Sequence, residues 1–348
     1  MEQLTEQRAG MPSSLKALYA PVAGALSDVE DLLAAELSSG HAFVDGLIRH
    51  GFRLGGKKLR PALVLLSGQA TGSRHPALSR LAGAVELIHV ATLVHDDVLD
   101  EADLRRHLAT VNARWDNETS VLLGDYLLAR SICLAASIDS SSGEVGGEDA
   151  HLSCAFACRA IAEAARMMCE GELRQAASRG NFQIDEQEYL DIIAGKTAAL
   201  IACSCQLGAH YADAEPDVVE RLVRYGHNLG IAFQIADDLL DMTGDEAVAG
   251  KSLGTDLDKQ KPTLPLIHVM QQASAEERRS LQKVLTGDGN HRRKTLQPWF
   301  ERYGAVEYAR RRAAAFAQAA RREIEPLDRS PAAEALRGLT RFVVDRES

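Results

Sequence analysis

Two short aspartate runs are the part of this 348-residue sequence best suited to chemistry. Both place carboxylates at positions i, i+1 and i+4, and the runs are Asp96, Asp97 and Asp100, and Asp237, Asp238 and Asp241. On a helix, the first and last aspartates of a run lie about 40° apart around the axis and one turn apart along it. Each run follows an apolar stretch, where repelling and unpaired carboxylates are costly. Oxygen ligands of this kind suit a hard cation such as Mg²⁺, and Gln234 adds a neutral oxygen near the second run.

Basic and polar residues near both runs could bind phosphate without a metal. The candidates are Lys57, Lys58, Arg60, His89, Arg105, Arg106, Lys196, Thr197, Lys251 and Lys261. Taken singly, an exposed turn, a lysine that extends to solvent or a core histidine would explain each of them. A solvated acidic helix end would likewise explain one aspartate run, but two copies after strongly apolar segments argue against it. Together, the residues predict a site that holds one diphosphate through metal and a second through direct contact with cations.

The elements that position these residues are predicted to be helices. The chain is rich in Ala and Leu, aromatic residues make up 5% of it, and no proline occurs between Pro76 and Pro216. Apolar residues recur at helical spacing in 78–92 and 219–240, on more than one side of each helix. We therefore expect a large all-α bundle, a single domain over residues 1–348. Residues 1–15 are expected to be flexible, and 139–150 to form a mobile loop.

Composition excludes several classes of protein. The 39 Lys and Arg against 49 Asp and Glu give a net charge of −10, which argues against nucleic-acid binding, and 46% hydrophobic residues exclude general disorder. Residues 1–10 contain no apolar run, so no signal peptide is expected. The most apolar segment, 121–138, is interrupted by Asp125 and Arg130, so no membrane span is expected. The six cysteines form no C-x-x-C pair and are expected to be buried free thiols in a reducing cytoplasm.

Five motifs make the sequence resemble the trans-isoprenyl diphosphate synthases of the polyprenyl synthetase family, most of all the medium- and long-chain heptaprenyl, octaprenyl and solanesyl types. They are GGKKLRP (55–61), ELIHVATLVHDDVLDEADLRR (86–106), GKTAAL (195–200), FQIADDLLD (233–241) and GKSLGTDL (250–257). The resemblance implies an all-α bundle around a central active-site cavity, with the aspartate runs facing each other across its mouth. It also implies a cytoplasmic homodimer, without a membrane span but with transient membrane contact for product release.

Matching positions imply the role of each candidate residue. All six aspartates of the two runs would bind Mg²⁺, with three ions per site and Mn²⁺ as a substitute. The residues for isopentenyl diphosphate would be Lys57, Arg60, His89 and Arg106. Those for the allylic diphosphate would be Arg105, Lys196, Thr197, Gln234, Lys251 and Lys261. The catalytic residues would be Asp96, Asp97, Asp100, Arg105, Lys196, Asp237, Asp238 and Lys251. Lys58 stands where Arg is common and His107 where Gly is common, and neither departure puts the activity in doubt.

The implied reaction is a Mg²⁺-dependent prenyl transfer. Isopentenyl diphosphate would add head-to-tail, in successive steps, to farnesyl or geranylgeranyl diphosphate, and the product would be an all-trans polyprenyl diphosphate. Metal and cations would stabilise the departing diphosphate, which then accepts the proton, while the apolar cavity excludes water. The alternatives are a short-chain farnesyl or geranylgeranyl synthase and the catalytic subunit of a heteromeric synthase. A terpene cyclase or a head-group transferase needs no second diphosphate site, so GGKKLRP and Arg106 argue against both.

Product length is predicted from the residues below the first run. Ala91 lies five residues before Asp96, or about 7.5 Å along a helix axis. Short-chain relatives typically close this level with aromatic side chains, whereas Ala91 and Thr92 are small and would let the tail continue. We therefore expect a product of about seven to ten isoprene units. The alternative is that Ala91 merely allows two helices to pack closely.

Overall fold

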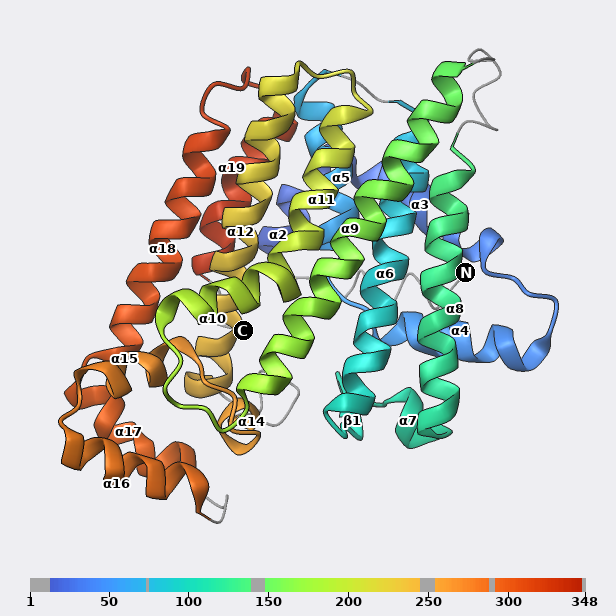
Figure 1. Ribbon diagram of the computed structural model, residues 1–348. Coiled ribbons are helices and arrows are strands. Elements are labelled where there is room, and N and C mark those ends of the chain that lie inside the picture. Colours follow the sequence, from blue (N-terminus) through green and yellow to red (C-terminus); the bar gives the residue numbers. More distant parts are fainter. Residues whose placement is uncertain (1–12, 73–74, 139–147, 245–253, 288–291, 346–348) are drawn as a thin grey trace. The chain divides into compact units, whose positions relative to one another are not determined.

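The computed structural model describes residues 13–72, 75–138, 148–244, 254–287 and 292–345 and confirms the predicted all-α fold (Figure 1). The first elements are α2 (Ser13–Leu18), the 3₁₀ turn η1 (Ala20–Val22), α3 (Ala23–Glu36), α4 (Ala42–Leu54), α5 (Leu59–Ala70), α6 (Ala77–Leu99), β1 (Leu104–Arg105), β2 (Leu108–Ala109), α7 (Val111–Arg114) and α8 (Asn117–Ala136). The next are α9 (Glu148–Ser178), α10 (Glu186–Ile193), the π-helical turn η2 (Ala194–Ala198), α11 (Ala199–His210) and α12 (Pro216–Thr243). The last are α14 (Thr255–Asp258), α15 (Leu264–Gln272), α16 (Ala275–Thr286), α17 (Arg292–Arg302), α18 (Ala305–Glu323) and α19 (Pro331–Val344).

The described residues group into two compact units. Unit 1 draws on Met1–Ala165, Leu200–Arg224 and Glu323–Leu339, and unit 2 on Arg166–Ala199, Tyr225–Arg322 and Thr340–Ser348. The single domain therefore stays a prediction. Residues 1–12 of the segment predicted to be flexible and residues 139–147 of the predicted loop lie outside the described residues.

Helix α6 is the centre of unit 1. It packs along α8 and is also contacted by α3, α4 and α5. Leu81, Val85 and Ile88 are fully buried on it, and so are Leu63 and Leu66 of α5. Because neighbours cover several sides of α6, its apolar residues do not follow a single stripe, as predicted from the sequence.

The core of unit 2 lies among α10, η2, α12 and α14 to α17, with Ile193, Ile235 and Leu264 at its centre. Two glycines let α9 approach η2 backbone to backbone. A Cβ at Gly171 would collide with the backbone nitrogen of Lys196, and one at Gly195 would lie 2.9 Å from the Met167 carbonyl oxygen. Single π turns often mark functional sites, and this one carries Lys196 and Thr197.

By length and composition alone, three described segments, 77–99, 117–136 and 186–210, are apolar enough to cross a membrane. This finding weakens the argument from charges inside segment 121–138, and the absence of a membrane span stays a prediction. In the first and third of these segments, most of the apolar window is buried within the protein, which accounts for its composition. All six cysteines are free, as expected, but only Cys203 and Cys205 are buried, whereas Cys133 and Cys169 are exposed.

Candidate active site

The first aspartate run lies where α6 ends. Asp96 and Asp97 are in the last helical turn and Asp100 is the C-cap. Glu101 follows with a positive φ of 49°, and the Ala102 backbone nitrogen donates to the Asp97 carbonyl at 2.9 Å, which closes the end of the helix. The run therefore lies at the negative end of the helix dipole, where additional negative charge is unfavourable and a cation is favoured.

Asp97 is not a solvated carboxylate. It is 1% exposed, and Arg105 of β1 donates to its Oδ1 from Nε at 2.9 Å and from Nη2 at 2.8 Å. The residue predicted to contact the allylic diphosphate is therefore paired with a predicted metal ligand. This contact joins the hairpin of β1 and β2 to the end of α6.

The turn of that hairpin carries the second arginine. Arg106 and His107 have φ values of 51° and 62° at its two central positions, where hairpin turns favour glycine or asparagine. His107, which stands where Gly is common in the family, thus adopts a left-handed conformation that costs a non-glycine residue about 1 kcal/mol. The turn directs Arg106 to the GGKKLRP motif, where its Nη1 donates to the Gly55 carbonyl at 2.6 Å. Residues from two motifs, 51 positions apart in the sequence, therefore meet in unit 1.

Electrostatics suit this part of unit 1 to an anion. Burial lowers the pKa of Arg60 to about 10, and the nearby Glu86 carboxylate partly offsets this by raising the same pKa. The Arg60 guanidinium is therefore still charged at pH 7. Burial, followed by the charge of Arg60, lowers the pKa of His89 well below 6.5, so its imidazole is neutral and can donate one hydrogen bond. Lys58 pairs with Glu30 of α3.

Glu86 lies beside the predicted isopentenyl diphosphate residues and was not predicted from the sequence. It is 3% exposed on α6, one turn before His89, and lies among the charges of Arg60, Lys58 and Arg106. Burial raises the pKa of its carboxyl, and these cations lower it. A lone acidic residue in an apolar helix was the signal that could have identified it.

Substitution of Gly56 by Ala is expected to raise the KM for isopentenyl diphosphate about tenfold or more. A Cβ at Gly56 would lie 3.0 Å from Arg106 Cζ and closer still to Nη2, so the guanidinium must move away. Loss of one hydrogen bond to a charged group costs about 1.5–3 kcal/mol, and each 1.4 kcal/mol is tenfold in affinity. Initial rates at varied concentrations of each substrate measure the effect, and the KM for the allylic substrate should stay within about twofold.

Gly46→Ala is the matched control for this substitution. Gly46 lies on α4 in the same unit, and a Cβ there would meet nothing within 4 Å. Both KM values of this variant should equal those of the wild type. Equal KM values in the Gly56→Ala variant as well would remove Arg106 from the predicted isopentenyl diphosphate site.

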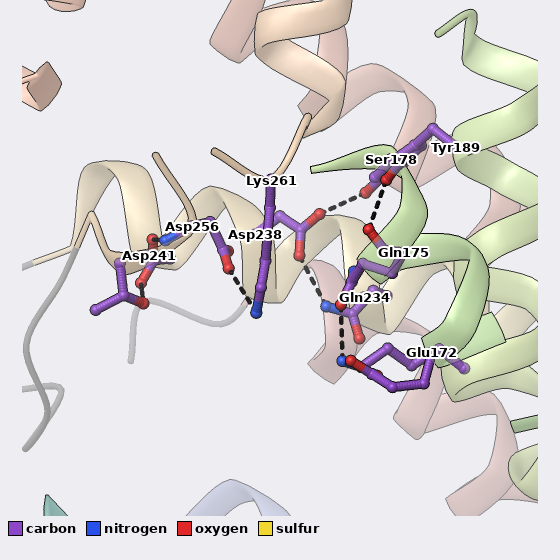
Figure 2. Close-up of polar contacts among 11 residues, drawn as sticks. Glu172, Gln175, Ser178, Tyr189, Gln234, Asp238, Asp241, Asp256 and Lys261 are labelled. Atoms are coloured by element: carbon purple, nitrogen blue, oxygen red, sulfur yellow. Dashed lines mark hydrogen bonds and ion pairs between the residues drawn. The ribbon is translucent and has the colours of Figure 1, made fainter. Parts of the chain in front are cut away.

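The second aspartate run lies in the last two turns of α12, in unit 2, and Figure 2 shows Asp238 and Asp241 of this run. Asp238 is 8% exposed, and each of its carboxylate oxygens has a donor: Tyr189 at 2.7 Å and the Gln234 amide nitrogen at 2.7 Å. The Thr197 hydroxyl donates to the Gln234 carbonyl oxygen at 2.6 Å, which fixes the direction of that amide. Thr197 and Gln234, predicted to contact diphosphate, therefore also support an aspartate of the run.

Asp241 connects the run to α14. Its carboxylate accepts the Thr255 hydroxyl at 3.1 Å and the Asp256 backbone nitrogen at 3.2 Å, at the start of that helix. The Asp256 carboxylate lies 3.6 Å from the ammonium group of Lys261, which is itself buried. Asp256 is thus a further carboxylate beside the run that the motif reading did not single out.

The Lys196 ammonium group is held by α9. It pairs with the carboxylate of Glu172 and donates to the Gln175 side chain at 2.8 Å. Glu172, Gln175 and Tyr189 were missed in the sequence because no local spacing links them to the aspartates. Figure 2 shows them approaching the run from α9 and α10.

The predicted site residues thus divide between the two units. Unit 1 holds Asp96, Asp97, Asp100, Lys57, Arg60, His89, Ala91, Thr92, Arg105 and Arg106. Unit 2 holds Lys196, Thr197, Gln234, Asp237, Asp238, Asp241 and Lys261. Lys251 lies outside the described residues. The opposition of the two runs across one cavity stays a prediction.

The donor chemistry of both runs fits Mg²⁺. Among the residues that the structure describes, no three Asp, Glu, His or Cys side chains converge on a possible metal position. This is compatible with Mg²⁺, which typically takes one or two carboxylates and completes its shell with water and substrate phosphates. Burial and then repulsion by Asp256 raise the pKa of the Asp238 carboxyl, so a bound cation would favour its ionised form.

Comparisons with known proteins give consistent results. A sequence profile described as polyprenyl synthetase matches residues 41–301. The all-trans-nonaprenyl-diphosphate synthase (geranyl-diphosphate specific) of Rhodobacter capsulatus is 34% identical over 330 residues, which are 94% of this chain and 97% of that protein. Heptaprenyl diphosphate synthase component 2 of Geobacillus stearothermophilus is 39% identical over 256 residues, 74% of this chain and 76% of its own length. A crystal structure of polyprenyl synthase from Caulobacter crescentus CB15, complexed with calcium and isoprenyl diphosphate, has a TM-score of 0.86 and 30% identity, over 96% of this chain and 98% of that one.

Proposed function

The chain belongs to the polyprenyl synthetase family, and from that premise we propose that it is a Mg²⁺-dependent trans-prenyltransferase. It condenses isopentenyl diphosphate with an allylic diphosphate, farnesyl or geranylgeranyl diphosphate, in successive head-to-tail steps. The product is an all-trans polyprenyl diphosphate of about seven to ten units. The names of the relatives, nonaprenyl and heptaprenyl synthases, support this range.

One observation carries the proposal. Two adjacent arginines of the hairpin contact different parts of unit 1: Arg105 binds Asp97 of the first run, and Arg106 binds the Gly55 carbonyl in the GGKKLRP motif. Unit 1 therefore combines a carboxylate run with a separate group of cations around Arg60 and the neutral His89. A terpene cyclase binds a single diphosphate and has no use for the second group. A prenyltransferase needs both.

The chain's own residues would hold the two substrates in different ways. Lys57, Arg60, His89 and Arg106 bind the diphosphate of isopentenyl diphosphate directly. The aspartates of both runs would hold Mg²⁺, which would supply Lewis-acid stabilisation of the charge on the departing diphosphate. The cations that share this charge are Arg105, Lys196, Lys251 and Lys261, with Thr197 and Gln234 as neutral donors. Apolar side chains keep water from the allylic cation, and the released diphosphate takes up the proton.

We further propose a cytoplasmic homodimer that needs no other subunit. Exposed apolar side chains of α8, Val121, Leu122 and Ile132, supply a surface that a second copy would cover. The name of the Geobacillus relative, a component 2, keeps the heteromeric alternative open, in which a partner protein would cover this surface. Product release would involve only transient contact with a membrane.

The purified chain should elongate farnesyl or geranylgeranyl diphosphate with labelled isopentenyl diphosphate in the presence of Mg²⁺. Chromatography of the dephosphorylated products should give about seven to ten units, and chelation of Mg²⁺ by EDTA should abolish incorporation. A product that ends at three or four units would establish the short-chain alternative. Incorporation that requires added partner protein would establish the heteromeric one, and a cyclic hydrocarbon formed without isopentenyl diphosphate would overturn the proposal.

A further inference from the structure

Tyr189 is a polar residue in the apolar core of unit 2. Its helix, α10, begins at Asp185, whose carboxylate caps the first turn by accepting the Glu188 backbone nitrogen at 2.8 Å. Tyr189 lies one turn further along, is 3% exposed, and packs with Phe182, Ile193 and other apolar residues. A phenylalanine would fill nearly the same space, so packing alone does not require the hydroxyl group.

The hydroxyl group of Tyr189 has a specific acceptor. It donates to Oδ2 of Asp238 at 2.7 Å, across from α10 to α12 (Figure 2). A tyrosine hydroxyl group is ordinarily protonated throughout the physiological range, so Tyr189 is the donor in this contact. The contact is therefore a hydrogen bond from a phenol to a buried carboxyl group, with a short donor–acceptor distance.

The two oxygens of Asp238 are held from different elements. Gln234 donates to Oδ1 from the preceding turn of the same helix, and its own direction is fixed by Thr197 of η2. Tyr189 holds the other oxygen from α10, so the plane of the carboxylate is fixed on both sides. With only the Gln234 contact, the carboxylate could rotate about its Cβ–Cγ bond.

We infer that Tyr189 is a positioning residue: its hydroxyl group fixes the carboxylate of Asp238 so that the second aspartate run is preorganised for Mg²⁺ and the allylic diphosphate. The inference rests on the proposed function of that run. Residues that orient metal ligands through a hydrogen bond typically change metal affinity or activity by about 10- to 100-fold when they are replaced. Tyr189 does not touch substrate in this role and acts only through Asp238.

Tyr189→Phe tests the inference because it removes the hydroxyl group and keeps the ring in the core. Binding of Mn²⁺ in the presence of inorganic diphosphate, followed by electron paramagnetic resonance, should weaken about 10-fold or more. In steady-state assays, the half-saturating Mg²⁺ concentration and the KM for the allylic substrate should rise. The KM for isopentenyl diphosphate should stay within twofold, because its predicted residues lie in unit 1.

Tyr308→Phe is the matched control. Tyr308 also belongs to unit 2, and its hydroxyl group also binds a carboxylate, that of Glu186, which the proposal does not place in the site. This variant should bind Mn²⁺ like the wild type. Equal weakening in both tyrosine variants, together with equal falls in melting temperature, would indicate general loosening and overturn the inference.

A double-mutant cycle with Asp238→Asn decides the case if Tyr189→Phe also lowers the melting temperature. If Tyr189 acts through the carboxylate, its replacement should weaken Mn²⁺ binding far less in the Asp238→Asn background than in the wild type. Full additivity, or unchanged Mn²⁺ binding in Tyr189→Phe, would contradict the inference. Absence of any prenyl elongation by the wild-type chain would instead contradict the proposed function.

Discussion

Replacement of Asp96 or Asp237 by Ala is expected to reduce turnover about 1000-fold or more in each case. Each substitution removes the first carboxylate of a run that is proposed to hold Mg²⁺. Lewis-acid stabilisation of a departing oxyanion contributes several kcal/mol, and each 1.36 kcal/mol in the barrier is tenfold in rate. The measurement is kcat for incorporation of labelled isopentenyl diphosphate at saturating substrates and Mg²⁺.

The same substitutions should leave the fold intact or stabilise it. Asp96 lies in the last turn of α6, at the negative end of the helix dipole, where a negative charge is unfavourable, and Asp237 has the like charge of Asp241 one turn away on α12. A melting temperature equal to or above that of the wild type, with turnover lost, would separate chemistry from folding. Asp217→Ala, an exposed position at the start of α12, is the control and should keep full activity. Turnover within a few-fold of the wild type in either test variant would contradict the two-run hypothesis.

Ala91→Phe is expected to shift the main product to about three or four isoprene units. Ala91 is 3% exposed on α6, about 7.5 Å along the axis from Asp96. If the product tail passes this level, a phenyl ring would occupy its path and stop elongation, while the first condensation should be nearly unaffected. Chromatography of the dephosphorylated products measures the shift.

Stability distinguishes this prediction from the alternative that Ala91 only permits close packing. A phenyl ring forced into a filled core costs about 1–3 kcal/mol, whereas a ring that enters the product path should cost little. Ala82→Phe is the matched control, since Ala82 is also buried on α6 but lies nine residues away, on the opposite side of the helix. It should destabilise the protein without shortening the product. Wild-type product length in the Ala91→Phe variant would mean that the tail follows another face.

The sequence by itself determined the fold class and the chemical character of the site. Helix formers, the long interval without proline and the helical apolar spacing predicted α6 and α12, which the structure has at Ala77–Leu99 and Pro216–Thr243. Spacing also predicted that the first and last aspartates of each run share one helical face, because the geometry of a helix is set by local hydrogen bonds and is the same wherever it occurs. The order of the five motifs indicated the family.

Only the tertiary structure decided which groups hold these residues. Arg106 reaches the Gly55 carbonyl across 51 positions, and Tyr189 reaches Asp238 across 49. No periodicity connects such pairs, since a hydrogen bond between distant segments depends on how the helices pack. The same holds for the buried Glu86, whose cationic surroundings appear only when α5, α6 and the hairpin come together. Local spacing specifies which face a side chain occupies, and packing specifies what that face meets.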